Sequence, residues 1–185
     1  MDDMKRKIIV IVFLLSIHLS YSQNVNWVSM DEAQELIKQE PRKIIMDVYT
    51  SWCGPCKMLD KYTFGNPDVA NYINENFYAV KFNAEGNSTV NFNNSTFTNP
   101  DYNPAKASRR NSKHQFANYL NVKAYPTIIF MGADLKLLAP ITGYLSPQKI
   151  EIYLKFFKTD AYKDVNSEED WEKYQEEFVH QFDGK

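Results

Sequence analysis

Two cysteines, Cys53 and Cys56, are separated by two residues, and they are the only cysteines in the sequence of 185 residues. A C-x-x-C pair can exchange a dithiol for a disulfide, supply half of a zinc site, or attach haem when His follows it directly. Lys57 follows the pair here, and the 3 histidines are scattered along the chain. A zinc or haem site therefore lacks ligands, and the pair indicates redox chemistry without a metal or a cofactor.

The pattern around the pair places it at the junction of a strand and a helix. Residues 43–50 contain a short apolar run typical of a buried strand, and apolar residues recur at helical spacing after Cys56. A cysteine at the N-terminal edge of a helix faces unpaired N–H groups and the positive end of the helix dipole, which lower its pKa. We therefore expect Cys53 to be the exposed nucleophile and Cys56 to be the shielded resolving thiol.

Two charged residues occupy positions where apolar side chains are expected. Asp47 is the one acidic residue in the first strand, and Lys81 is the one charge in a second predicted buried strand, residues 77–83. A lone buried carboxyl group has a raised pKa, which suits a general base near neutral pH. A structural ion pair between Asp47 and Lys81 is the alternative interpretation.

Strands and helices alternate along the rest of the chain. Helix caps precede several apolar stretches of 3.6-residue period, and a turn at residues 132–134 joins two short strands into an antiparallel hairpin. This order predicts an α/β fold with a mixed central sheet and helices on both faces. The expected helices start at Ser29, Asn66, about His114, Ser146 and about Ser167; the hairpin strands are 128–131 and 135–141.

The N-terminus has the features of a signal peptide. Three basic residues precede an apolar run, residues 8–19, and small residues follow before Gln23. The run is shorter than the roughly 20 residues that a membrane-spanning helix needs. We therefore expect residues 1–22 to be removed by cleavage near Ser22 and Gln23, leaving a periplasmic or secreted protein.

Residues 84–113 follow no period and are rich in Asn, Gly, Pro, Ser and Thr, which predicts an irregular surface insertion. The insertion leaves the strand 77–83 at the sheet edge where the strand before Cys53 also ends, so it should border the cysteines. One hypothesis is that Phe92, Phe97 and Tyr102 help to select a protein substrate, and the alternative is a solvated loop.

The last residues, 163–185, are expected to form a helical extension. Its aromatic residues fall on one side of the predicted tail helix and should pack on the body of the protein: Trp171, Tyr174, Phe178 and Phe182. The 21 basic and 23 acidic side chains are spread along the chain and sum to a net charge of −2. No stretch resembles a polyanion-binding surface, which argues against nucleic acid as a partner.

Separated segments, in order, resemble the thioredoxin family. They are Ile44-Ile45-Met46-Asp47, Trp52-Cys53-Gly54-Pro55-Cys56-Lys57, then Lys81, then Tyr125-Pro126-Thr127 and Thr142-Gly143. The resemblance covers about residues 27–158 apart from the insertion. It implies a thioredoxin fold for residues 23–162, with the insertion at about 84–113 and the extension at 163–185 as additions.

The resemblance also implies roles for individual residues. Asp47 matches the carboxylate that takes the proton from the resolving cysteine, with Lys81 as its partner. Pro126 matches a cis-proline that presents backbone to a bound peptide. Gly54 permits close approach of a substrate, and Pro55 stiffens the start of the helix. The implied catalytic residues are Cys53, Cys56, Asp47 and Lys81; the implied substrate-binding residues are Trp52, Gly54, Pro55, Tyr125, Pro126 and Gly143.

Two departures from the common thioredoxins bear on specificity and origin. Tyr125 replaces the usual aliphatic residue before the cis-proline, and Lys61 stands where a helix-kinking proline is common. The run from Cys56 to Phe64 is instead similar to the exported C-terminal domain of the transmembrane thiol:disulfide interchange protein.

This similarity implies a reductant of protein disulfides outside the cytoplasm, supplied with electrons by a membrane thiol reductase. An oxidising compartment would otherwise leave the cysteines as a disulfide. The alternatives are a disulfide oxidase or isomerase, and a partner-binding module whose affinity the cysteines gate.

Overall fold

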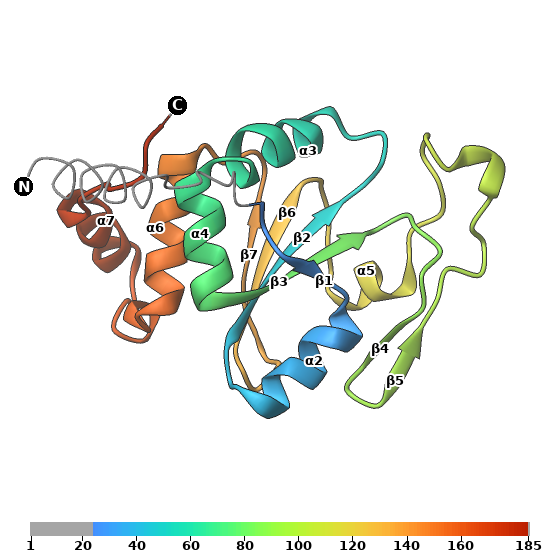
Figure 1. Cartoon of the computed structure of the whole chain (residues 1–185), viewed down its shortest axis with the longest axis horizontal. Coiled ribbons are helices and arrows are strands. Elements are labelled where there is room, and N and C mark those ends of the chain that lie inside the picture. Colours follow the sequence, from blue (N-terminus) through green and yellow to red (C-terminus); the bar gives the residue numbers. More distant parts are fainter. Residues whose placement is uncertain (1–23, 185) are drawn as a thin grey trace, which may run out of the picture.

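The computed structural model describes residues 24–184, so the predicted signal peptide lies outside the described residues (Figure 1). Within them, a five-stranded sheet has the strand order β1-β3-β2-β6-β7. Strands β1, β3 and β2 are mutually parallel, and β6 and β7 are antiparallel to their neighbours. The strands are β1 (Trp27–Val28), β2 (Lys43–Tyr49), β3 (Phe77–Asn83), β6 (Thr127–Met131) and β7 (Leu137–Thr142).

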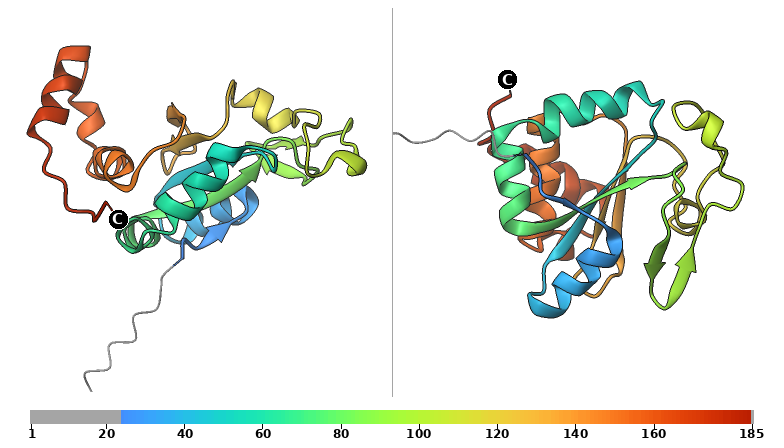
Figure 2. Two further views of the ribbon diagram at one scale, coloured as in Figure 1. Left: turned by 90° about the horizontal axis from the view of Figure 1, so that it is seen from above. Right: turned by 45° about the vertical axis from the view of Figure 1, so that its right-hand side comes forward.

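Helices cover both faces of this sheet, as the sequence predicts (Figure 2). Alternate residues of β2 enter two separate cores because successive strand side chains point to opposite faces. Ile45 joins the core formed with α4 and α6, whereas Ile44 and Met46 join the core formed with α2 and α5. The helices are α2 (Met30–Gln39), α3 (Gly54–Met58), α4 (Pro67–Asn76), α5 (Gln115–Tyr119), α6 (Pro147–Lys158) and α7 (Glu168–Glu177).

The helices begin where the sequence places their caps. The Ser29, Asn66 and Ser146 side chains each accept hydrogen bonds from backbone N–H groups in the first turn of α2, α4 and α6. Such bonds satisfy N–H groups that the helix itself leaves unpaired. None of the helices in residues 24–184 is long and apolar enough to cross a membrane.

The insertion is more regular than predicted. Strands β4 (Val90–Phe92) and β5 (Ser95–Phe97) form a hairpin. Asn93 and Asn94 make its turn with φ angles of 49° and 60°, the left-handed conformation that two-residue hairpin turns require. The prediction of an irregular surface segment is therefore wrong for residues 90–97, because strands of three residues are too short to show a period.

The proposed role of Phe92 in substrate selection is also wrong. Phe92 is only 3% exposed and packs with Phe116 of α5 at 5.4 Å between ring centroids. Phe97 packs on the same ring at 5.3 Å. Both rings extend the α2–α5 core because the hairpin folds back onto α5. Phe97 and Tyr102 are only partly buried, and their roles stay predictions.

The base of the insertion is tied to the body by polar contacts. Asn99 is buried, and its side-chain amide donates to the backbone oxygens of Gly86 and Ser112. The backbone N–H of His114 donates to Ala84, which closes the two ends of the insertion at 2.8 Å. Beyond these ties, residues 100–110 form a surface tip that includes the short 3-10 helix η2 (Pro104–Lys106).

The C-terminal extension packs on the body, as expected. Trp171 and Tyr174 of α7 lie against Phe156 of α6, with ring centroids 5.0 and 4.9 Å away. The helix ends at Glu177, however, so the predicted continuation through Phe178 and Phe182 is wrong. The chain turns back there, and Phe182 packs on Tyr72 of α4.

A buried carboxylate anchors this returning segment. Glu151 of α6 is fully buried and accepts hydrogen bonds from the Lys155 side chain and from the backbone N–H groups of Gln181 and Phe182. His180 contacts the same carboxylate at 3.2 Å. Burial alone would raise the pKa of Glu151, but the hydrogen bonds from these four residues outweigh it and lower the pKa.

The Glu151→Gln substitution should reduce the free energy of unfolding at pH 7 by about 2 kcal/mol, because it removes hydrogen bonds to a charged acceptor. Because the native pKa is below 4.5, the carboxylate stabilises the fold above that pH and loses this contribution as the pH falls through the native pKa. Urea denaturation at pH 7 and pH 3 measures both effects. Glu172→Gln, at an exposed position of α7, is the control; an equal loss for Glu151→Gln at both pH values would contradict the account.

Candidate active site

The two cysteines form a disulfide at the start of α3, directly after the central strand β2. Cys53 is the N-cap residue, and its sulfur accepts a hydrogen bond from the backbone N–H of Cys56 at 3.1 Å. The predicted strand-to-helix junction is confirmed. The helix continues beyond α3 as a π-helical segment, η1 (Leu59–Phe64). The N–H groups at this end favour negative charge on the Cys53 sulfur.

The expected difference in exposure between the cysteines is absent from the described structure. Cys53 and Cys56 are each 2% exposed, whereas Gly54 and Pro55 between them are exposed. The disulfide explains this result, because it draws the Cys53 sulfur toward Cys56 and its backbone N–H. The prediction of an exposed Cys53 is therefore wrong for the disulfide form.

The predicted substrate-binding loops meet beside this helix start. The Tyr125-Pro126 peptide bond is cis, as the resemblance implies. Gly143 has a φ of 101° and donates its backbone N–H to the Pro126 oxygen at 2.8 Å. A side chain at position 143 would be strained in this conformation. The bond joins the loop before β6 to the loop after β7.

Asp47 lies in the interior, opposite Lys81 in the register of β2 and β3. Its Oδ2 is 3.5 Å from the Lys81 Nζ, and neither carboxyl oxygen has a hydrogen-bond partner among the described residues. Burial raises the pKa of Asp47 to about 7; Lys81 lowers it, and the negative charge of Asp60 raises it. The group can therefore exchange a proton near neutral pH.

Sequence reasoning missed Asp60, which forms a closer ion pair with Lys81 than Asp47 does. Asp60 comes from η1, one turn after Cys56, and competes for the lysine charge. Because Lys81 is shared with Asp60, it neutralises the Asp47 carboxylate less than it would in an ion pair with Asp47 alone. The spacing from Cys56 to an acidic residue at i+4 is a helical signal that could have identified it.

Trp52 connects the cysteine loop to the insertion. Its indole N–H donates to Glu85 Oε2 at 2.7 Å, and the Arg110 guanidinium lies 4.7 Å from its ring centroid. The ring also makes an edge contact with Tyr125 at 6.2 Å. Burial, with the Glu85 charge as a lesser cause, raises the pKa of Tyr125 to about 12. The insertion therefore borders the cysteines as predicted, through Glu85 and Arg110, which sequence reasoning missed.

Comparison with known families matches residues 30–158 to the thioredoxin-like domain. This chain belongs to the thioredoxin-like family. The family's thiol:disulfide exchange chemistry accords with the Cys53–Cys56 pair.

Curated relatives of this thioredoxin-like chain include the thiol:disulfide interchange protein DsbD. The Tatumella citrea protein is 26% identical over 140 residues, which cover 75% of this chain and 20% of the relative. The Klebsiella pneumoniae protein is 36% identical over 52 residues, 28% of this chain and 8% of the relative. The chain thus spans about a fifth or less of the length of these relatives.

Solved structures confirm the predicted thioredoxin fold. A thioredoxin-fold protein from Helicobacter pylori superposes with a TM-score of 0.57 at 18% identity, covering 85% of this chain and 87% of the other. A thioredoxin from Thermus thermophilus gives a TM-score of 0.52 at 14% identity, covering 72% and 87%. At these identities the likeness concerns the fold alone.

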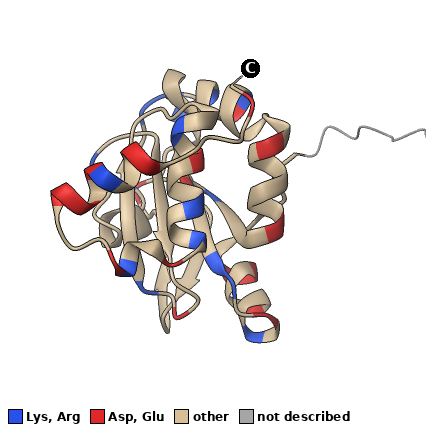
Figure 3. Ribbon diagram, turned by 90° about the vertical axis from the view of Figure 1, so that its left-hand side faces the viewer, with Lys and Arg blue, Asp and Glu red and all other residues tan. Residues whose placement is uncertain are grey.

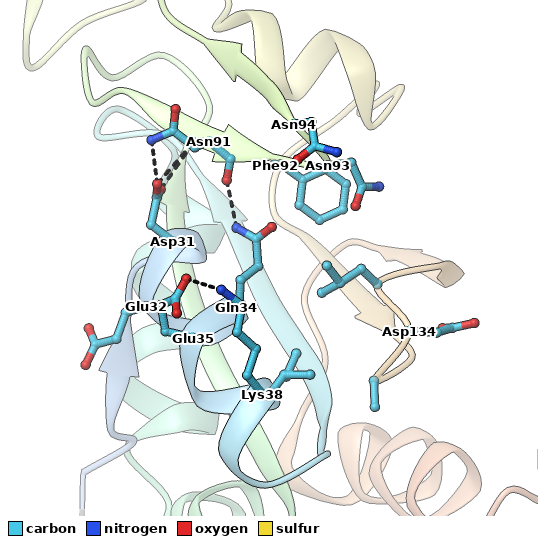
Figure 4. A pocket seen from close by; sticks show the side chains of 13 residues that line it. Asp31, Glu32, Gln34, Glu35, Lys38, Asn91, Phe92, Asn93, Asn94 and Asp134 are labelled. Atoms are coloured by element: carbon cyan, nitrogen blue, oxygen red, sulfur yellow. Dashed lines mark hydrogen bonds and ion pairs between the residues drawn. The ribbon is translucent and has the colours of Figure 1, made fainter.

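A separate groove of about 680 Å³ lies between α2, the β4–β5 hairpin and the β6–β7 turn (Figure 4). Its lining includes none of the residues predicted to be catalytic or to bind substrate beside the cysteines of this thioredoxin-like chain, although Phe92 of the insertion contributes to it. Asn91 of β4 bonds across it to Asp31 and Gln34 of α2, so the contacts there attach the hairpin to the body. Among residues 24–184, no three His, Cys, Asp or Glu residues are grouped to hold a metal.

Replacing Asp47 by Asn should stabilise the protein above pH 7. The Asp47 pKa is raised from 3.8 to about 7 in the folded state, so near pH 3 the group is protonated in both the folded and the unfolded state and does not change the free energy of unfolding. As the pH rises from about 4 to 7, the group ionises more readily in the unfolded state. Asp47 then lowers the free energy of unfolding by an amount that reaches roughly 4 kcal/mol, by the conversion from pKa to free energy. Urea denaturation of the disulfide form at pH 3 and pH 8 measures it.

Asp101→Asn, at an exposed position of the insertion tip, is the matched control for loss of one carboxylate. A stability gain for Asp47→Asn that is the same at pH 3 and pH 8 would show that the pKa of Asp47 is not raised.

Proposed function

We propose that this protein is an exported thiol:disulfide oxidoreductase that reduces protein disulfides through Cys53 and Cys56. The observation that carries the proposal is the position of Cys53 as the N-cap of α3, where the Cys56 N–H donates to its sulfur. The cis peptide bond before Pro126 supports it, because this residue matches the peptide-presenting proline of the family.

In the proposed reaction, the Cys53 thiolate attacks one sulfur of a substrate disulfide. The substrate S–S bond breaks, a mixed disulfide forms, and the other substrate sulfur leaves as a thiolate that takes up a proton. Asp47 then accepts the proton of the Cys56 thiol, and the Cys56 thiolate attacks the Cys53 sulfur. The second substrate sulfur leaves and is protonated, so two electrons pass to the substrate and Cys53–Cys56 becomes a disulfide.

The reducing direction requires an electron supply. The predicted signal peptide places the protein in the periplasm or outside the cell, where an unsupplied dithiol would stay oxidised. The similarity to thiol:disulfide interchange proteins named DsbD supports a membrane thiol reductase as the donor. Protein disulfides are the proposed substrates, and the partners include no nucleic acid and no metal.

The reduced protein should accelerate insulin reduction by dithiothreitol, measured as turbidity of the released B chain. Cys53→Ser should abolish the acceleration because the attacking thiolate is lost, and Cys56→Ser should trap a mixed disulfide visible by mass spectrometry. If insulin is not reduced and Cys53→Ser retains partner binding, the protein is a binding module instead.

Equilibration of the pair with glutathione separates a reductant from an oxidase. A reductant should have a potential near the value of about −270 mV for thioredoxin. A potential near about −120 mV, the value for a strong disulfide oxidant, would reverse the proposed direction.

Asp47→Asn should slow the resolution of a preformed Cys53 mixed disulfide roughly 100-fold at pH 7, because the general base is lost. The difference should shrink above about pH 9, where thiols in general lose their proton to solvent without a base. Stopped-flow measurement of product release from pH 6 to pH 10 gives both values. An unchanged resolution rate for Asp47→Asn would leave Asp47 with a structural role only.

A further inference from the structure

The tip of the insertion carries unpaired positive charge. Lys106, Arg109 and Arg110 are all exposed, and none of them forms an ion pair within residues 24–184. We call these three residues the basic tip. Asp101 is the one acidic residue between positions 100 and 111.

The basic tip is held against the cysteine loop. The Ser51 hydroxyl donates to the backbone oxygen of Ala107 at 2.5 Å, and Arg110 covers the Trp52 ring. Glu85 Oε2 accepts from both the Trp52 indole and the Asn111 backbone N–H, each at 2.7 Å. The Glu85 carboxylate beside the tip is therefore already engaged by two hydrogen-bond donors.

The tip itself is closed by a reciprocal amide pair. The Asn111 side chain accepts from the Asn103 backbone N–H at 2.9 Å and donates to the Asn103 oxygen at 2.8 Å. These two bonds join the ends of the segment that carries Lys106 and Arg109. The backbone that carries the basic groups is therefore held in a defined conformation, and Arg110 lies over Trp52 of the cysteine loop.

Charge is distributed differently at the other end of the molecule. The insertion and α7 lie at opposite ends (Figures 1 and 2). On the face that holds α6 and α7, acidic and basic positions are interspersed (Figure 3). The whole chain has a net charge of −2, so the cationic tip is a local feature and not a consequence of composition. Lys57, directly after Cys56, and Lys123, two residues before Tyr125, are also exposed.

We propose that the basic tip selects protein disulfides that are flanked by acidic residues. The inference rests on the proposed function and specifies the substrate class of the same site. A substrate disulfide next to Cys53 brings its flanking side chains beside Trp52 and Arg110. Opposite charges at an interface raise the association rate and disfavour partners of like charge. Salt screens such attraction between exposed groups.

Two disulfide peptides of equal length test the proposal, one with glutamates and one with lysines flanking the cystine. The reduced protein should transfer electrons to the glutamate peptide at least about tenfold faster in 20 mM salt, with the ratio approaching one in 500 mM salt. Lys106→Glu/Arg109→Glu should invert or abolish this ratio. Lys149→Glu/Lys158→Glu, at exposed positions of α6 with the same change of charge, should retain it.

The outcomes separate this inference from the proposed function. If both peptides are reduced at equal rates and the tip variant changes nothing, the selectivity is wrong while the oxidoreductase function stands. If neither peptide is reduced faster than by Cys53→Ser, the proposed function is wrong. Calorimetric binding of the two peptides to Cys53→Ser/Cys56→Ser then decides the inference: tighter binding of the glutamate peptide supports it, and equal affinity overturns it.

Discussion

The central position of β2 is the constraint on which the site depends. This strand is bonded to β3 on one side and to β6 on the other, and both of its faces are covered by helices. Its register sets Asp47 opposite Lys81 and sets Val48 opposite Thr127, the residue after the cis-proline. The chain then passes from β2 to Cys53 within a few residues. One central strand thus positions the carboxyl group, the cysteine and the cis-proline loop together.

Burial of Asp47 opposes stability, and the surrounding structure compensates. A carboxyl group in the interior without a close hydrogen bond costs free energy once it ionises. Two apolar cores, one on each face of β2, offset this cost. The insertion enlarges one of them, because Phe92 and Phe97 pack on Phe116, and so the segment that carries the basic tip is fixed to the body.

Much of this architecture follows from local sequence signals. Ser29, Asn66 and Ser146 begin helices because a side-chain oxygen beside an apolar period can cap the first turn. Residues 77–83 form the strand that their composition predicts. The cysteine pair could be identified because the sequence has no other cysteine, and Asp47 could be identified because it interrupts an apolar run. The sequence by itself therefore determined the family, the central fold and the position of the cysteine pair at a strand-to-helix junction.

The tertiary structure decided which distant residues surround the cysteine loop and the buried carboxyl group. Glu85 and Arg110 meet Trp52 through contacts that leave no period in the sequence. Helical spacing could place Asp60 on the same side as Cys56, but only the folded chain shows that Asp60 pairs with Lys81. The burial of Cys53, whose sulfur is bonded to Cys56, is likewise seen only in the folded chain. Local patterns report how a segment turns and which side is apolar. Contacts between segments depend on loop closure and packing, and only the folded chain brings those groups together.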